Sequence, residues 1–173
     1  MEFTKPHMIK KIAYVLLIAL IVMQFIRPAW NISTTESANH ISKKYTVPAS
    51  TNGILEKACY DCHSNNTVYP WYANVQPVGY WLNDHVNEGK SELNFSEFLT
   101  YSPKKARNKM RKVVEEVKEG GMPLDSYTWI HRNAILTQEE KTEITTWADN
   151  IANQITKENN LPPPEPKKPG RED

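Results

Sequence analysis

The sequence predicts an all-α fold, in which one small helical domain accounts for most of the 173 residues. Apolar residues recur with helical spacing in two long segments, after Ser102 and after Leu136, and no segment shows the strict alternation of a half-buried strand. The composition of the segments on either side of these helices indicates the limits of the domain. We expect the domain at residues 48–157, between a polar tether at 31–47 and a Pro-rich, disordered tail at 158–173.

The N-terminal segment, residues 1–30, contains an apolar run. Three lysines precede the run at 12–26, and Arg27 follows it. As a helix the run would extend about 22 Å, less than the roughly 30 Å of a hydrocarbon core. No obvious cleavage site follows, so we expect an uncleaved, single-pass transmembrane anchor at the inner membrane. The lysines would keep the N-terminus cytoplasmic and place the domain in the periplasm. A cleaved signal that releases the domain into the periplasm is the alternative.

Two helices are expected in the first half of the domain. Ser50 is a candidate N-cap for a short helix that leads toward residue 58. A second helix is expected over residues 77–88, with Gly89 as its end.

Two longer helices are expected in the second half of the domain. Ser102 is a candidate N-cap with Pro103 at the first helical position, and Gly120 would end this helix. Thr137 and Glu140 have the spacing of a capping box at the start of the last helix. Each helix has one apolar stripe, formed by Met110, Val113, Val114 and Val117 in the first and by Ile144, Trp147, Ala148 and Ile151 in the second.

The most specific motif is the segment Cys59-Tyr60-Asp61-Cys62-His63. Its C-x-x-C-H spacing is the signature of c-type haem attachment. Two thiols at this spacing can each form a thioether to the haem, and the adjacent imidazole can ligate the iron. The chain has two cysteines, both in this motif, so none remains for a disulfide framework. The motif predicts one covalent haem c per chain, with His63 as an iron ligand.

Three other interpretations of the two cysteines remain open. A thioredoxin-like redox pair would require a strand before the motif, whereas the preceding residues favour a helix. A zinc site would need a further ligand, for which His40, His85 and His131 are candidates. A disulfide between the two cysteines is the third possibility.

The second axial ligand of the iron is a separate question. Met122 lies in the segment Gly120-Gly121-Met122-Pro123-Leu124, where glycine allows close approach and proline stiffens the loop. We therefore predict Met122 as the distal metal ligand. Met110 on its helical stripe, or a histidine such as His85 or His131, is the alternative.

Three stretches together resemble the bacterial haem-binding domain family, which is similar to single-haem cytochrome c modules. They are CYDCHSNNTVYPWY, DHVNEGKSELNFSEF and GGMPLDSYTWIH, and with the last helix the resemblance covers about residues 50–150. The resemblance implies an all-α, cytochrome c-like domain around one haem, with haem c bound through Cys59 and Cys62 and His63 as proximal ligand. Met122 matches the position of the family's MP motif, which supports it as the distal ligand.

The predicted function is single-electron transfer by a membrane-tethered, mono-haem c-type cytochrome. Ligation by His63 and Met122 would raise the reduction potential and leave no open iron position, which favours an electron carrier over an enzyme. We expect a redox protein as partner, and the net charge of +1 argues against nucleic acid. The alternative is a haem-based enzyme or sensor, of peroxidase or gas-binding type, with an open or displaceable distal site.

Overall fold

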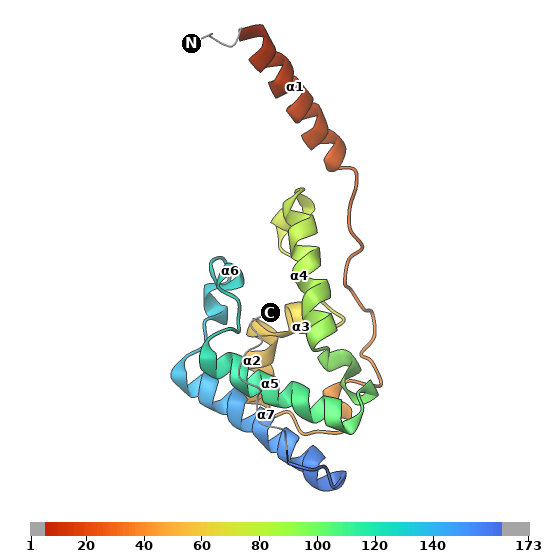
Figure 1. The fold of residues 1–173 in the computed structure, drawn as a ribbon, viewed down its shortest axis with the longest axis vertical. Coiled ribbons are helices and arrows are strands. Elements are labelled where there is room, and N and C mark those ends of the chain that lie inside the picture. Colours follow the sequence, from red (N-terminus) through yellow and green to blue (C-terminus); the bar gives the residue numbers. More distant parts are fainter. Residues whose placement is uncertain (1–5, 164–173) are drawn as a thin grey trace.

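The computed structural model describes residues 6–163, and within this range every regular element is a helix (Figure 1). The prediction of an all-α fold is confirmed. Four short 3-10 helices, η1 to η4, connect the longer elements. The α-helices are α1 (Pro6–Met23), α2 (Ala49–Ala58), α3 (Tyr60–His63), α4 (Val78–Glu92), α5 (Pro103–Glu119), α6 (Asp125–Thr128) and α7 (Gln138–Glu158), and the 3-10 helices are η1 (Ile41–Lys43), η2 (Trp71–Asn74), η3 (Phe95–Thr100) and η4 (Arg132–Ala134).

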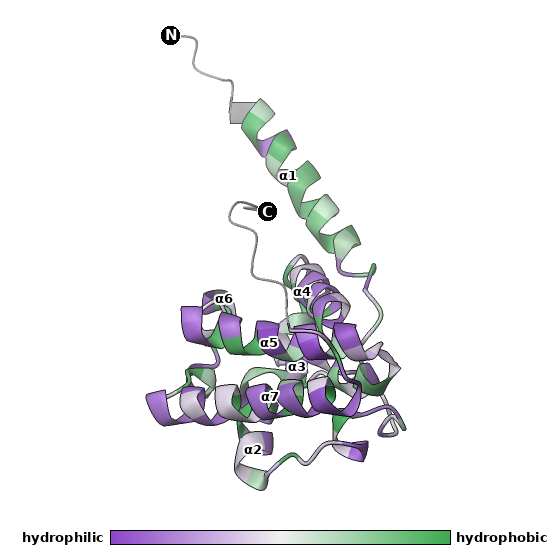
Figure 2. Ribbon diagram, turned by 60° about the horizontal axis from the view of Figure 1, so that its bottom comes forward, coloured by the Kyte–Doolittle hydropathy of each residue, from purple (hydrophilic) through white to green (hydrophobic). Residues whose placement is uncertain are grey.

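The α5–α7 pair forms the main apolar core. The two helices lie side by side, and their hydrophilic faces point outward (Figures 1 and 2). Met110 of α5 and Ile144 and Ile155 of α7 are almost completely buried between them. Phe95 and Phe98 of η3 extend the same core. Complete burial of these large side chains removes most of their apolar surface from water, which is the main stabilising contribution to folding.

Local capping signals determine where α5 begins and ends and where α7 begins. Pro103 occupies the first turn of α5, where its missing N–H leaves no helical bond unmade. Gly120 ends α5 with a left-handed φ of 80°, which glycine adopts without steric cost. The side chains of Thr137 and Glu140 form the predicted capping box of α7. Helix α5 therefore begins and ends at its predicted positions, and α7 begins at its predicted position.

The predicted end of α4 at Gly89 is wrong. The helix continues to Glu92, and Leu93 is the first residue with extended backbone. Glycine lowers helix stability by about 1 kcal/mol relative to alanine, which is too little to end a helix that tertiary contacts favour.

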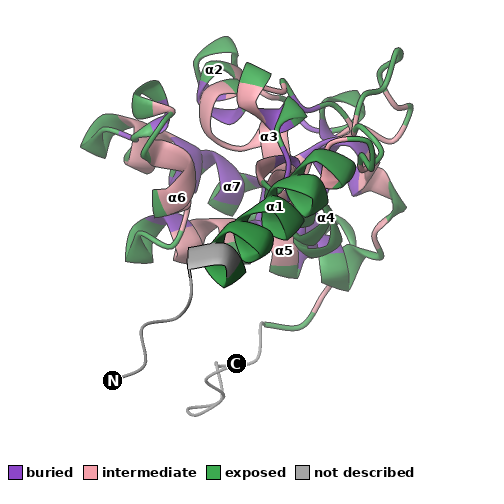
Figure 3. Ribbon diagram, turned by 90° about the horizontal axis from the view of Figure 1, so that it is seen from above, coloured by how far each residue is buried: buried purple, intermediate pink, exposed green. Residues whose placement is uncertain are grey.

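Helix α1 extends away from the domain, and the side chains of residues 8–22 are exposed (Figures 2 and 3). Within residues 6–163, no helix is both long and apolar enough to cross a membrane. The predicted membrane helix is therefore not supported. Its uncharged part, residues 12–23, extends only about 18 Å, and Phe25 and Ile26 lie beyond the helix end.

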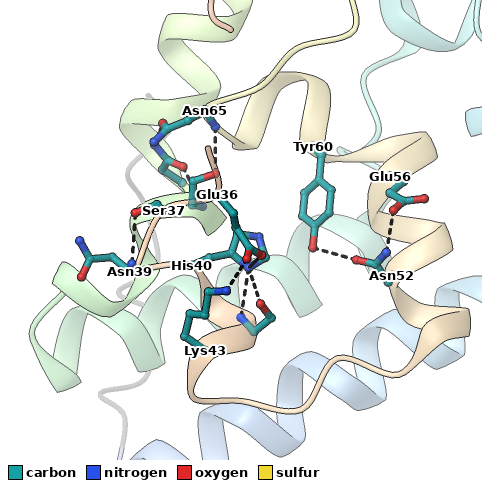
Figure 4. Close-up of polar contacts among 12 residues, drawn as sticks. Glu36, Ser37, Asn39, His40, Lys43, Asn52, Glu56, Tyr60 and Asn65 are labelled. Carbon is teal, nitrogen blue, oxygen red and sulfur yellow. Dashed lines mark hydrogen bonds and ion pairs between the residues drawn. The ribbon is translucent and has the colours of Figure 1, made fainter. Parts of the chain in front are cut away.

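Residues 31–47, the predicted polar tether, are folded against the domain. Ile41 and Tyr45 are 0% and 5% exposed, and Tyr45 packs edge-on against Phe98. Lys43 and His40 both contact Glu36 within this segment (Figure 4). The composition is polar, but two isolated apolar side chains suffice to fix the segment to the core. The described part of the predicted disordered tail, residues 158–163, contacts the domain: Glu158 is the last residue of α7, Leu161 packs against the core, and the carbonyl of Pro162 accepts from Arg107. The rest of the predicted tail lies outside the described residues.

Candidate haem site

The five-residue motif lies at a break between two helices. Cys59 has φ −131°, which separates α2 from α3. The backbone N–H groups of Cys62 and His63 both donate to the carbonyl of Cys59, at 3.2 and 2.9 Å. This single turn brings both thiols and the imidazole together, as covalent attachment beside an iron ligand requires.

The surroundings of the two thiols do not favour the other interpretations of the motif. Burial raises the pKa of Cys59 to about 12 and that of Cys62 to about 11, whereas a redox C-x-x-C has a lowered thiol pKa. The thiols are not joined by a disulfide. Among residues 6–163, no three His, Cys, Asp or Glu side chains are grouped as a metal site. His40, one candidate zinc ligand, instead caps η1 by accepting the N–H of Ser42.

His63 is oriented by two backbone carbonyls of the α4 end. Its Nδ1 lies 2.8 Å from the oxygen of Gly89 and 3.0 Å from that of Leu93. A carbonyl can only accept, so Nδ1 bears the hydrogen and Nε2 keeps its lone pair. Burial lowers the pKa of His63, which favours the neutral imidazole. A neutral histidine that donates from one nitrogen and presents the other is the usual arrangement of a metal-ligating histidine.

Gly89 allows α4 to approach the motif closely. A Cβ at this position would lie 2.7 Å from the carbonyl oxygen of Cys62 and 2.9 Å from its Cβ. Such distances are too short for real contacts, so any other residue would push α4 away from α3. The carbonyl of Gly89 that receives His63 would move with it.

Asp61, between the two cysteines, connects the motif to two other segments. One carboxylate oxygen accepts the N–H of Val68 at 3.0 Å, and the other accepts the hydroxyl of Tyr127 at 2.6 Å. Its neighbour Tyr60 donates to Asn52 of α2 and packs against Phe95 (Figure 4). The residues inside the motif therefore fix its position in the fold.

Asn31 is a site-supporting residue that sequence reasoning missed. Its amide donates to the carbonyl of Ser64 at 2.9 Å and to the hydroxyl of Thr67 at 2.8 Å, and its side-chain oxygen accepts from Lys90 at 2.6 Å. Its backbone N–H donates to the hydroxyl of Tyr69. A lone asparagine in a polar segment has no local signal that could have revealed this role.

An apolar cavity of about 240 Å³ adjoins the motif. Cys62 and Asp61 form one part of its wall, and residues of α4, of the loop before η2 and of the segment around α6 form the rest. In Figures 1 and 3, α6 lies across from α3 and α4. Three wall residues, Val68, Trp81 and Ile130, remain 77%, 46% and 62% exposed, so much apolar surface at the mouth is uncovered.

The structure places the two methionine candidates differently. Met110 is fully buried in the core cluster of α5 and α7, away from the cavity wall. Met122 is half-buried, and its N–H donates to the carbonyl of Glu116 at 3.2 Å. It is not among the residues that line the cavity, although Leu124, two positions later, is. Its role as distal ligand stays a prediction.

Both remaining candidate histidines line the cavity. His85 belongs to α4, and His131 follows α6. In each, Nδ1 lies within hydrogen-bond distance of the carbonyl four residues earlier, so Nε2 keeps its lone pair.

An attachment motif, a histidine with an available Nε2 and an adjoining apolar cavity define a helical haem-binding protein. The comparison with protein families leads to the same class. The chain belongs to the haem-binding domain family, whose model matches residues 18–150. No curated protein and no solved structure matches the chain.

The residues present fit a haem group. Apolar walls suit the porphyrin, the exposed side chains at the mouth would be covered by it, and His63 offers a nitrogen to the iron. Haem is therefore the cofactor of this domain. Its covalent attachment through Cys59 and Cys62 stays a prediction.

Proposed function

We propose that this protein is a mono-haem c-type cytochrome that transfers single electrons. Cys59 and Cys62 would form the two thioethers, and His63 would be the proximal iron ligand. The observation that supports this most directly is the orientation of His63, whose Nδ1 donates to the carbonyls of Gly89 and Leu93 and leaves Nε2 for a metal.

The chain's own residues would prepare the site for electron transfer. When bound, haem supplies an iron that alternates between ferrous and ferric states. Two carbonyl acceptors hold the imidazole of His63 in one orientation, so little rearrangement accompanies a change of charge. Apolar side chains of α4 and of the segment around α6 exclude water from the cavity, which helps to set the potential.

Export of the domain and contact with a membrane belong to the same proposal. The lysines before the apolar run support export, because basic residues tend to stay on the cytoplasmic side. The exposed apolar side chains of α1, such as Leu16 and Ile18, support membrane contact, because apolar surface of this extent is typical of an interaction site. Gln24 exchanges two hydrogen bonds with the backbone of Gln76, so the helix end is fixed to the domain. A membrane contact would keep the haem near a redox-protein partner at the inner membrane, on the periplasmic side.

The intact mass of the full chain, produced in cells with haem-attachment machinery, tests the proposal. We expect the mass of one added haem, which persists under denaturing conditions and is lost in the Cys59→Ser/Cys62→Ser variant. The variant Met110→Leu, at a core position outside the site, is the control and should keep the haem. A wild-type mass without haem would refute covalent attachment. The same spectrum reports whether the N-terminal segment is retained.

A further inference from the structure

The segment around α6 provides the cavity wall that faces the motif. It contributes Leu124, Tyr127, Ile130 and His131. His63 is hydrogen-bonded to the end of α4, so a second iron ligand on the opposite side has to come from a segment other than α4. The α6 segment lies across from α3 and α4 in both views of the fold (Figures 1 and 3).

His131 has the same hydrogen-bond arrangement as His63. Its Nδ1 donates to the carbonyl of Tyr127 at 3.1 Å, which leaves Nε2 with a lone pair. Its ring stacks on that of Tyr127, with 4.2 Å between the centroids and 16° between the planes. The imidazole is therefore held in one orientation at the cavity wall.

Tyr127 connects this histidine to the attachment motif itself. Its hydroxyl donates to the carboxylate of Asp61 at 2.6 Å. Burial and the neighbouring carboxylate raise the pKa of Tyr127, so the phenol remains a donor. Asp61 lies between the two cysteines, so one strong hydrogen bond holds Tyr127, on which His131 stacks, against the motif.

The other candidates have weaker positions. His85 lies one turn before Gly89 on α4, the helix whose carbonyl accepts the N–H of His63, so the two histidines belong to the same side of the site. Met122, like His63, is not among the cavity-lining residues, whereas His131 is.

We infer that His131 is the distal axial ligand of the haem iron and that Tyr127 is its positioning residue. This inference rests on the proposed haem function and replaces the predicted His/Met pair by two histidines. Without methionine ligation the reduction potential is lower than that of a His/Met cytochrome.

The test uses the full chain with haem attached. It compares His131→Ala with the competing candidates Met122→Ala and His85→Ala, and with the control Met110→Leu outside the cavity, by electronic absorption and paramagnetic resonance. We expect the wild type to be low-spin in the ferric state without the charge-transfer band of a methionine–iron bond. Met122→Ala and His85→Ala should keep this spectrum. His131→Ala should become high-spin, bind CO readily when reduced, and return to low spin on addition of imidazole.

Two further variants keep the inference testable if His131→Ala folds poorly. His131→Met should fold around the same cavity and raise the potential. Tyr127→Phe keeps the ring stack but removes the bond to Asp61, so imidazole should displace the distal ligand about tenfold more readily. A methionine–iron band that disappears in Met122→Ala would overturn the inference, as would a low-spin spectrum unchanged in His131→Ala. Absence of haem from the wild-type mass would instead overturn the proposed function.

Discussion

The α5–α7 pair and the walls of the cavity differ in how completely they bury apolar side chains. Met110 and Ile144, between α5 and α7, are 0% and 1% exposed. In contrast, Val68, Trp81 and Ile130 line the cavity and remain largely exposed. One half of the fold thus completes its core with its own side chains, whereas the other half requires an apolar group that the chain does not supply. This difference locates the cofactor more firmly than the motif alone.

The largest expected effect is a difference in amide hydrogen exchange between the cavity walls and the α5–α7 pair when the haem is lost. In Cys59→Ser/Cys62→Ser, loss of the haem should leave the cavity walls unsupported, and amides of α4 and α6 should lose protection on the order of 100-fold. Amides in α5 and α7 should change far less, because no residue of either helix lines the cavity. An equal loss of protection in all four helices would contradict the division into two halves.

A smaller effect is expected from Gly89→Ala, which tests the close packing of α4 on the motif. The added Cβ meets Cys62, so unfolding free energy should fall by about 1–3 kcal/mol, and the His63 orientation should change. Gly53→Ala is the matched control, because a Cβ at Gly53 in α2 has no neighbour within 4 Å. It should be neutral or stabilise by about 0.5–1 kcal/mol. Denaturant unfolding measures both, and equal values for the two variants would refute the packing argument.

The smallest effect concerns an ion pair between the helix that precedes the motif and the start of α7. Lys57 of α2 contacts Glu140 at the start of α7, with 2.6 Å between Nζ and Oε1. This bond, and the backbone N–H of Thr137, lower the pKa of Glu140 below its ordinary value of 4.5. The contribution to stability is therefore present above that pH and is lost as pH falls through the folded pKa.

The variant Glu140→Gln keeps a capping-box acceptor but removes the charge. At neutral pH it should lose at most about 1 kcal/mol, and its stability should fall less steeply than that of the wild type below about pH 5. Unfolding curves across this pH range measure both quantities. Parallel pH profiles for the two proteins would show that the ion pair does not contribute.

The parts of the fold that could be predicted are those specified by local signals. Pro103, Gly120 and the Thr137–Glu140 box each act on their own neighbourhood, so both ends of α5 and the start of α7 follow from the sequence. The C-x-x-C-H spacing is local as well, and the haem-binding class follows from it.

Other features depend on contacts between distant residues and could not be predicted. Ile41 and Tyr45 are isolated apolar residues in a polar segment, and only the packed structure shows that they are buried. The hydrogen bonds of Asn31 join residues more than 30 positions apart. The stack of His131 on Tyr127 is local, but its position across from the motif depends on Asp61.

The hydrogen bonds of Asn31 also determine where the domain can be cut. A fragment that starts at residue 48, the boundary suggested by composition, would discard the donor for Ser64 and Thr67 and the acceptor for Lys90. It would also discard two apolar anchors of the core, Ile41 and Tyr45. For expression or grafting of the haem module, the minimal unit therefore begins before Asn31.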